Sequence, residues 1–97
     1  MSAPWPFDQS PNCATFTTSL VMREHEPITH VYHDEDDHAW QFHAADAASE
    51  DQMMIVALKE VVDLDPSVLE VADLPPGWMA IRPSLAAPWK RTQVPVG

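Results

Sequence analysis

The chain has 97 residues, of which 45% are hydrophobic, and a formal net charge of −10 at pH 7. This length and composition predict one folded domain with a modest core and exclude a disordered chain. The negative charge argues against nucleic acid and anionic membranes as partners, and no apolar run is long enough to span a bilayer. A lone cysteine, Cys13, excludes an internal disulfide, and no signal peptide is visible, so we expect a cytoplasmic protein.

The acidic residues are concentrated in the middle of the chain. Residues 24–73 hold 14 of the 15 acids and one base, Lys59, whereas residues 74–97 hold three bases and no acid. An acidic surface of this kind suits a basic protein partner. A competing explanation is that the charge only keeps a small domain in solution.

The first part of the chain predicts an extended arm followed by a strand. Residues 1–12 carry three prolines between polar residues, which favours an extended arm. Residues 13–18 are β-branched and aromatic and predict a strand. Residues 19–23 form either one helical turn or a continuation of that strand. We expect the folded domain to span 13–91, with a C-terminal tail over 92–97.

The next segment predicts an antiparallel hairpin. Alternating residues over 28–33 and 38–43 are typical of two strands. A charged loop connects them, and its residues are Asp34, Glu35, Asp36 and Asp37.

Side-chain alternation assigns the faces of this hairpin. Trp40 and Phe42 are expected to point into the core. His33 and His43 are expected to point outward, on the side away from these aromatic residues.

The following segment predicts the main helix. Ser49 to Gln52 fits a capping box, and apolar residues then recur at helical spacing, so we expect a helix over about 50–63. The apolar run 53–56 leaves an alternative open, in which a short buried strand precedes a shorter helix that begins at Leu58. Asp65 and Pro66 then start another helical turn.

A proline-rich turn introduces the last predicted strand. Pro76 followed by Gly77 suits a type II turn, because the third position of that turn needs a positive φ. The strand over 77–82 is expected to anchor Trp78 in the core and to bring Arg82 to a nearby carboxylate. The remaining residues are proline-broken, with Trp89 expected to fold back onto the body.

Together these segments predict an α+β fold. It consists of a small, mostly antiparallel sheet of about four strands, with one main helix packed on one face. Its structural anchors are expected to be Trp40, Phe42, Pro76, Gly77, Trp78 and Arg82.

The order of several motifs resembles a known family. The motifs are Trp-Gln-Phe at 40–42, Asp-Pro-Ser at 65–67 and Leu-Pro-Pro-Gly-Trp-Met-Ala-Ile-Arg at 74–82. Over residues 13–91 the chain resembles the small bacterial domain of unknown function called DUF2185, some members of which are assigned to the Imm33-type immunity proteins. The resemblance implies a role in neutralising a toxin and supplies no catalytic residues.

The histidines suggest an alternative, metal-binding function. All five lie in the first half of the chain beside the acidic loop, and imidazole with carboxylate is a common ligand set for transition metals. The site would combine His33, His38 and His43 with Asp34 or Asp36. Solvated histidines on a sheet face are the simpler explanation.

No motif indicates catalysis. Cys13 lacks a nucleophile signature, the serines are typical of helix caps, and two glycines cannot form a phosphate-binding loop. We therefore expect a non-enzymatic protein without a cofactor, which binds a basic partner through the loop at 34–37. A third possibility is a structural or regulatory subunit that forms a homodimer through an exposed sheet edge or its aromatic tails. A protein that only binds a basic partner could instead be a monomer.

Overall fold

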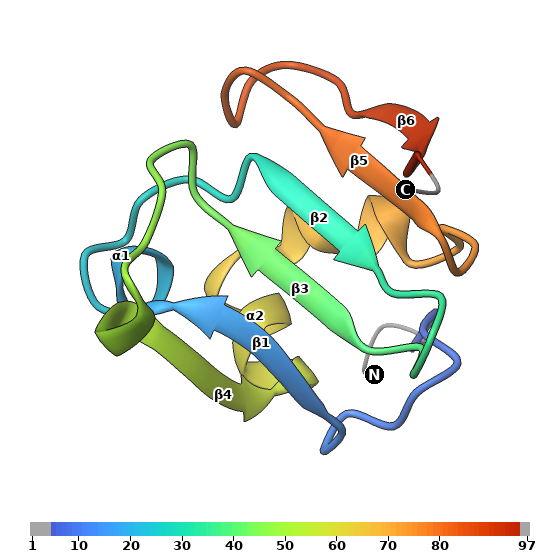
Figure 1. The fold of residues 1–97 in the computed structure, drawn as a ribbon, viewed down its shortest axis with the longest axis horizontal. Coiled ribbons are helices and arrows are strands. Elements are labelled where there is room, and N and C mark those ends of the chain that lie inside the picture. Colours follow the sequence, from blue (N-terminus) through green and yellow to red (C-terminus); the bar gives the residue numbers. More distant parts are fainter. Residues whose placement is uncertain (1–4, 96–97) are drawn as a thin grey trace.

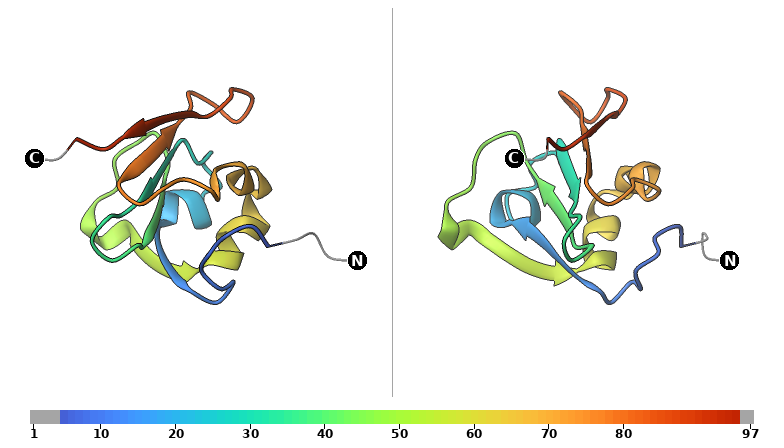
Figure 2. Two further views of the ribbon diagram at one scale, coloured as in Figure 1. Left: turned by 90° about the vertical axis from the view of Figure 1, so that its right-hand side faces the viewer. Right: turned by 45° about the vertical axis from the view of Figure 1, so that its right-hand side comes forward.

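A computed structural model describes residues 5–95, so residues 1–4 of the predicted arm and 96–97 of the predicted tail lie outside the described part. Six strands form one sheet in the order β4-β1-β3-β2-β5-β6, and the helical segments of residues 58–71 lie on one side of it (Figure 1, Figure 2). The strands are β1 (Ala14–Thr18), β2 (His30–His33), β3 (Trp40–His43), β4 (Met53–Ala57), β5 (Trp78–Ile81) and β6 (Lys90–Gln93). The helices are α1 (Ser19–Met22) and α2 (Leu58–Leu64), with 3-10 segments η1 (Glu50–Gln52) and η2 (Pro66–Val71).

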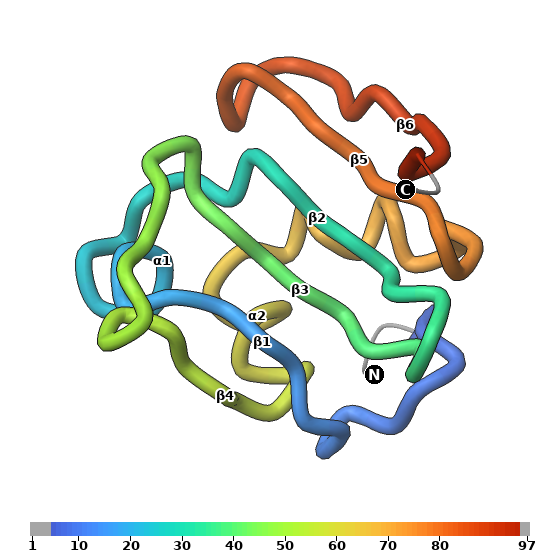
Figure 3. The backbone as a smooth tube through the Cα atoms, in the orientation of Figure 1, coloured from blue at the N-terminus to red at the C-terminus, as the bar shows by residue number. Residues whose placement is uncertain are grey.

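The sheet is mixed rather than wholly antiparallel. β1 runs parallel to β3, while all other neighbouring strands are antiparallel. The two edge strands, β4 and β6, lie at opposite ends of the sheet (Figure 3). The predicted hairpin is confirmed, because β2 and β3 pair from His30 with His43 to His33 with Trp40.

The predicted sheet of about four strands with one main helix is wrong. Residues expected as a helix over 50–63 form η1, β4 and α2 instead, and α2 is only seven residues long. The capping box at Ser49 is present but starts just one 3-10 turn. Met53–Ala57 then pairs with all of β1. The backbone groups of this segment therefore bond across the sheet and not within a helix. The alternative of a short strand followed by a helix from Leu58 is thereby confirmed, but the strand is not buried, because it lies at the edge of the sheet.

The second unexpected strand is β6. Lys90–Gln93 is polar and exposed throughout, so no hydrophobic alternation marks it in the sequence. It is a strand because its backbone pairs with the whole of β5, from Trp78 with Gln93 to Ile81 with Lys90. The strand extends across residue 91, where we expected the domain to end.

The core lies between the sheet and the helical segments. Trp40 and Phe42 are 1% and 0% exposed, which confirms their predicted direction. Phe7, from the predicted arm, is also buried and packs edge-on against Trp40, with ring centroids 5.1 Å apart. The other buried hydrophobic residues include Val21, Ile28, Val31, Leu58, Val61, Val68, Val71, Leu74 and Ala80.

The predicted type II turn leads into β5. The Trp78 N–H donates to the Pro75 carbonyl at 3.1 Å, and Gly77 has a φ of 86°, where glycine is favoured. Trp78 is half-buried and packs against the core. The turn is tied to β2 because the Gly77 N–H donates to the His33 carbonyl at 2.7 Å.

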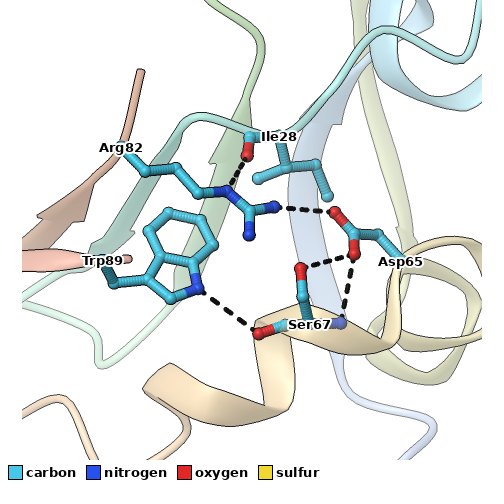
Figure 4. A network of polar contacts seen from close by, with 5 residues as sticks. All are labelled: Ile28, Asp65, Ser67, Arg82 and Trp89. Atoms are coloured by element: carbon cyan, nitrogen blue, oxygen red, sulfur yellow. Dashed lines mark hydrogen bonds and ion pairs between the residues drawn. The ribbon is translucent and has the colours of Figure 1, made fainter. Parts of the chain in front are cut away.

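Arg82 connects the end of β5 to η2 and to the last loop (Figure 4). Its guanidinium donates from Nε to the Ile28 carbonyl at 2.9 Å and from Nη2 to the Asp65 carboxylate at 3.0 Å. The guanidinium carbon lies 3.9 Å from the centroid of the Trp89 ring, whose N–H donates to the Ser67 carbonyl. The loop that leads into β6 is therefore fixed to the body by a buried cation.

None of the helices within residues 5–95 combines the length and the apolar character needed to cross a bilayer.

Candidate interaction site at the acidic loop

The acidic loop, residues 34–37, connects β2 to β3 in a tight turn. The Asp34 N–H donates to the Ala39 carbonyl at 2.8 Å, which closes the turn. The Asp37 carboxylate accepts from the Ala39 N–H at 3.0 Å. His38 has a φ of 58°, a left-handed conformation typical of tight turns. Hydrogen bonds within the hairpin thus give the loop a defined backbone.

The four acids of the loop have different surroundings. Asp34 is half-buried, and both of its carboxylate oxygens accept from the Gln41 side-chain amide, at 3.0 and 2.8 Å. Glu35, Asp36 and Asp37 are exposed. Asp34 therefore braces the loop, and the other three carboxylates are open to solvent and to a partner.

A hollow of about 310 Å³ lies beside this loop. The acidic loop forms one wall, and the other lining residues are Tyr32, His33, Gly77, Val94 and Pro95. Gly77 approaches the loop closely, since a Cβ atom there would lie 3.4 Å from the Glu35 carboxylate. Among the described residues, the lining contains four acidic residues and no lysine or arginine, so the hollow favours a cationic group.

His33 does not point outward, and that prediction is wrong. It lies opposite Trp40 in the β2–β3 register and stacks on its ring, with centroids 4.1 Å apart. The side chain is 5% exposed, and Nδ1 lies 2.6 Å from the Leu74 carbonyl, so Nδ1 carries the proton and donates. Nε2 is buried without a hydrogen-bond partner among the described residues. His33 is therefore part of the core beneath the hollow.

His43 lies on the opposite face of the sheet, away from the helices. The side-chain amide nitrogen of Gln41 donates to Asp34, so the amide oxygen of Gln41 faces His43. This oxygen accepts from His43 Nε2 at 3.0 Å. Burial lowers the pKa of His43 below its ordinary value of 6.5, the neighbouring His30 lowers it further, and Asp34 partly opposes the effect. The neutral imidazole is thus the form that fits this site.

The structure does not bring together the three histidines of the metal-binding alternative. His33 and His43 lie on opposite faces of the sheet, because the first pairs with Trp40 and the second lies three residues further along β3. His38 is exposed, with its ring centroid 6.1 Å from that of His33. Within residues 5–95 no three side chains of histidine, cysteine, aspartate or glutamate are placed to hold a metal ion.

Tyr32, Gln41, Val94 and Pro95 were not identified as site residues from the sequence. Gln41 entered the prediction only as part of the Trp-Gln-Phe motif, although a polar side chain between two core aromatics and next to a charged loop is a usable signal. Val94 and Pro95 reach the hollow because β6 pairs with β5, and nothing in their own sequence indicates this.

Comparison with known protein families, with characterised proteins and with solved structures finds no match for this chain. The resemblance of residues 13–91 to the DUF2185 family therefore stays a prediction, as does the immunity role that it implies.

Proposed function

We propose that this chain is a non-enzymatic, cytoplasmic protein-interaction module that binds a basic partner through its acidic loop. The observation that supports this most is the placement of three exposed carboxylates, those of Glu35, Asp36 and Asp37, on a braced hairpin turn beside a hollow. The histidines of the metal-binding alternative lack such a placement, because within residues 5–95 they do not come together.

The geometry of the loop favours binding. Its turn is closed by backbone hydrogen bonds and its first acid is fixed by Gln41, so little conformational freedom is lost when a partner docks. The hollow has room for a lysine or arginine side chain, which its carboxylates would bind by charge-assisted hydrogen bonds. The net charge of −10 would also attract a cationic partner from a distance and speed association.

The family resemblance gives this interaction a biological role. An immunity protein of the Imm33 type would use the acidic loop to cover a basic surface of its toxin. A toxin gene beside the gene for this chain, whose product binds the chain, would support the role. A tight complex that leaves the acidic loop exposed to solvent would contradict the use of this site.

The interaction is tested by NMR titration with a hexa-arginine peptide as the cationic probe. We expect the largest amide shifts at residues 34–39, at Gly77 and at Val94, which surround the hollow. Binding should weaken steeply between low and high salt, because surface charges are screened over about 10 Å at 0.1 M ionic strength. Shifts spread evenly over all acidic residues, or binding that salt does not change, would contradict the proposal.

A further inference from the structure

The edge of the sheet formed by β4 is open. β4 has one neighbour, β1, and within residues 5–95 no segment pairs with its other side. The pairing runs without interruption from Ala14 with Ala57 to Thr18 with Met53. β4 is therefore a straight edge strand without a bulge, a form that readily accepts a further strand.

The hydrogen-bonding pattern shows which backbone groups face this edge. The Leu58 N–H donates to the Cys13 carbonyl at 2.8 Å, so these two residues form a hydrogen-bonded pair in the same register. Bonded and non-bonded pairs alternate in an antiparallel ladder, so Val56 and Met54 also turn their backbone groups toward β1. Ile55, at the centre of β4, turns its N–H and C=O outward.

Ile55 has the free backbone donor of this edge. The two other outward N–H groups are already used: that of Met53 donates to the Glu50 carbonyl, and that of Ala57 to the Glu60 carboxylate at 2.9 Å. As far as residues 5–95 are concerned, the centre of β4 thus presents one unused donor and one unused acceptor, both on Ile55. Such a residue can pair with a copy of itself across a twofold axis.

The side chains of β4 do not protect this edge. Met53–Ala57 contains no charged residue and no proline, and Ile55 and Met53 are 67% and 41% exposed. The other edge strand, β6, carries Lys90 and Arg91, which are typical protection against pairing between edges. The molecule therefore guards one edge of its sheet and leaves the other suited to an apolar partner.

We propose that β4 pairs antiparallel with β4 of a second copy of this chain, about a twofold axis beside Ile55. The Ile55 N–H of each copy donates to the Ile55 carbonyl of the other, and their side chains meet on the face away from the helices. Met53 lies opposite Ala57 of the second copy. In the dimer the Ala57 N–H no longer donates to the exposed Glu60 carboxylate of its own chain and donates to the Met53 carbonyl of the other copy. The antiparallel arrangement also places Asp51, which precedes β4, beside Lys59, which follows β4 in the other copy.

This dimer is independent of the basic partner proposed above. In sheet order, β1 separates β4 from the hairpin that carries the acidic loop, so the loop stays accessible. Each copy carries a net charge of −10, so mutual repulsion opposes dimerisation and added salt should strengthen it. Binding of a cationic partner has the opposite dependence on salt, which lets the two proposals fail separately.

The dimer is tested by light scattering coupled to gel filtration over a wide range of protein concentration. We expect the mass to rise to twice that of the chain, at lower protein concentration in high salt than in low salt. Ile55→Lys should remain a monomer at every concentration, because it places two like charges together across the axis. Leu85→Lys is the matched control, since Leu85 is a 55% exposed hydrophobic residue away from this edge, and it should still dimerise. A wild-type monomer throughout, or equal effects of the two substitutions, would overturn the proposal.

The register is tested by cross-linking in a Cys13→Ser background, which removes the native thiol. Ile55→Cys should form a disulfide-linked dimer under mild oxidation, because Cα atoms of a hydrogen-bonded pair lie about 5.5 Å apart, within the range of a disulfide. Met53→Cys is on the same strand and face but should not cross-link to its counterpart, since the two lie four residues, or about 13 Å, apart along the strands. Cross-linking of Met53→Cys in preference to Ile55→Cys would overturn the assigned register.

Discussion

At the scale of single residues, His33 and His43 show how the register of a hairpin decides the role of a side chain. Their spacing and the alternation of β2 and β3 were read from the sequence, but the pairing of His33 with Trp40 was not. Directly opposed residues share a face, so this pairing places His33 in the core with Trp40 and leaves His43 on the outside. A polar residue on a core-facing position cannot be recognised from polarity alone.

The protonation of His43 makes stability depend on pH. Its pKa is lowered in the fold, so as pH falls below 6.5 the unfolded chain binds a proton that the folded chain does not. Stability contributed by the neutral form is present above the unfolded pKa and is lost as pH falls toward the folded pKa. We expect His43→Gln to have a flatter dependence of unfolding free energy on pH in this window, measured by urea denaturation.

The control for this measurement is His25→Asn. His25 is exposed and has a φ of 57°, a conformation that asparagine tolerates. This variant should keep the wild-type pH dependence. Equal slopes for His43→Gln and the wild type would show that the burial of His43 does not affect stability.

Arg82 is expected to be the most sensitive charged residue. Arg82→Leu removes the ion pair with the Asp65 carboxylate, which keeps only its bonds from Ser67, and takes the side-chain donor from the Ile28 carbonyl. It also removes the cation from the Trp89 ring. Because Asp65 keeps some contact with water, we expect a loss of about 2–3 kcal/mol, just below the range of about 3–5 kcal/mol for breaking a fully buried ion pair. In a domain of this size this lowers the melting temperature by roughly 10–20 °C.

Lys90→Leu provides the comparison for Arg82→Leu. Both substitutions replace a positively charged side chain with leucine, but Lys90 is exposed on β6. Thermal unfolding should change little, by less than about 0.5 kcal/mol, as is usual for surface substitutions. A similar loss for both variants would mean that net charge, rather than the network of Arg82, determines the effect.

At the scale of elements, the structure separates what local patterns specify from what tertiary pairing adds. The hairpin of β2 and β3 and the turn at Gly77 were predictable, because alternation and turn chemistry are local signals. β4 was ambiguous because a short apolar run with branched side chains suits a strand and a buried helix equally. β6 was not predictable because its neighbour β5, and not its own polar sequence, makes it a strand.

The turn before β5 provides a test at this scale. Gly77→Ala forces a Cβ atom into a left-handed conformation, which costs about 1–2 kcal/mol, and places it against Glu35. Asparagine tolerates this conformation better than alanine does, so Gly77→Asn should lose less. We expect the melting temperature to decrease in the order wild type, Gly77→Asn, Gly77→Ala. An unchanged melting temperature for Gly77→Ala would show that the turn can relax.

At the scale of the whole molecule, the charge is divided between surfaces with different properties. The acidic loop gathers exposed carboxylates at a hollow, β6 carries the basic residues Lys90 and Arg91, and β4 has no charge. The acidity itself was evident from composition, but the hollow was not, because Gly77 in the turn before β5 and the residues after β6 complete it. A basic partner and a second copy of the chain would therefore use separate parts of the surface.

The most direct test of the central claim compares two triple variants that remove the same charge. Glu35→Gln/Asp36→Asn/Asp37→Asn neutralises the exposed part of the acidic loop. The control, Asp46→Asn/Glu50→Gln/Asp51→Asn, neutralises three exposed acids before β4.

The affinity of each for the hexa-arginine peptide is measured by calorimetry at low salt. Loss of the loop carboxylates should weaken binding at least tenfold, about 1.4 kcal/mol, whereas the control should lose much less. Equal losses for the two triple variants would contradict the account, because net charge alone would then explain binding.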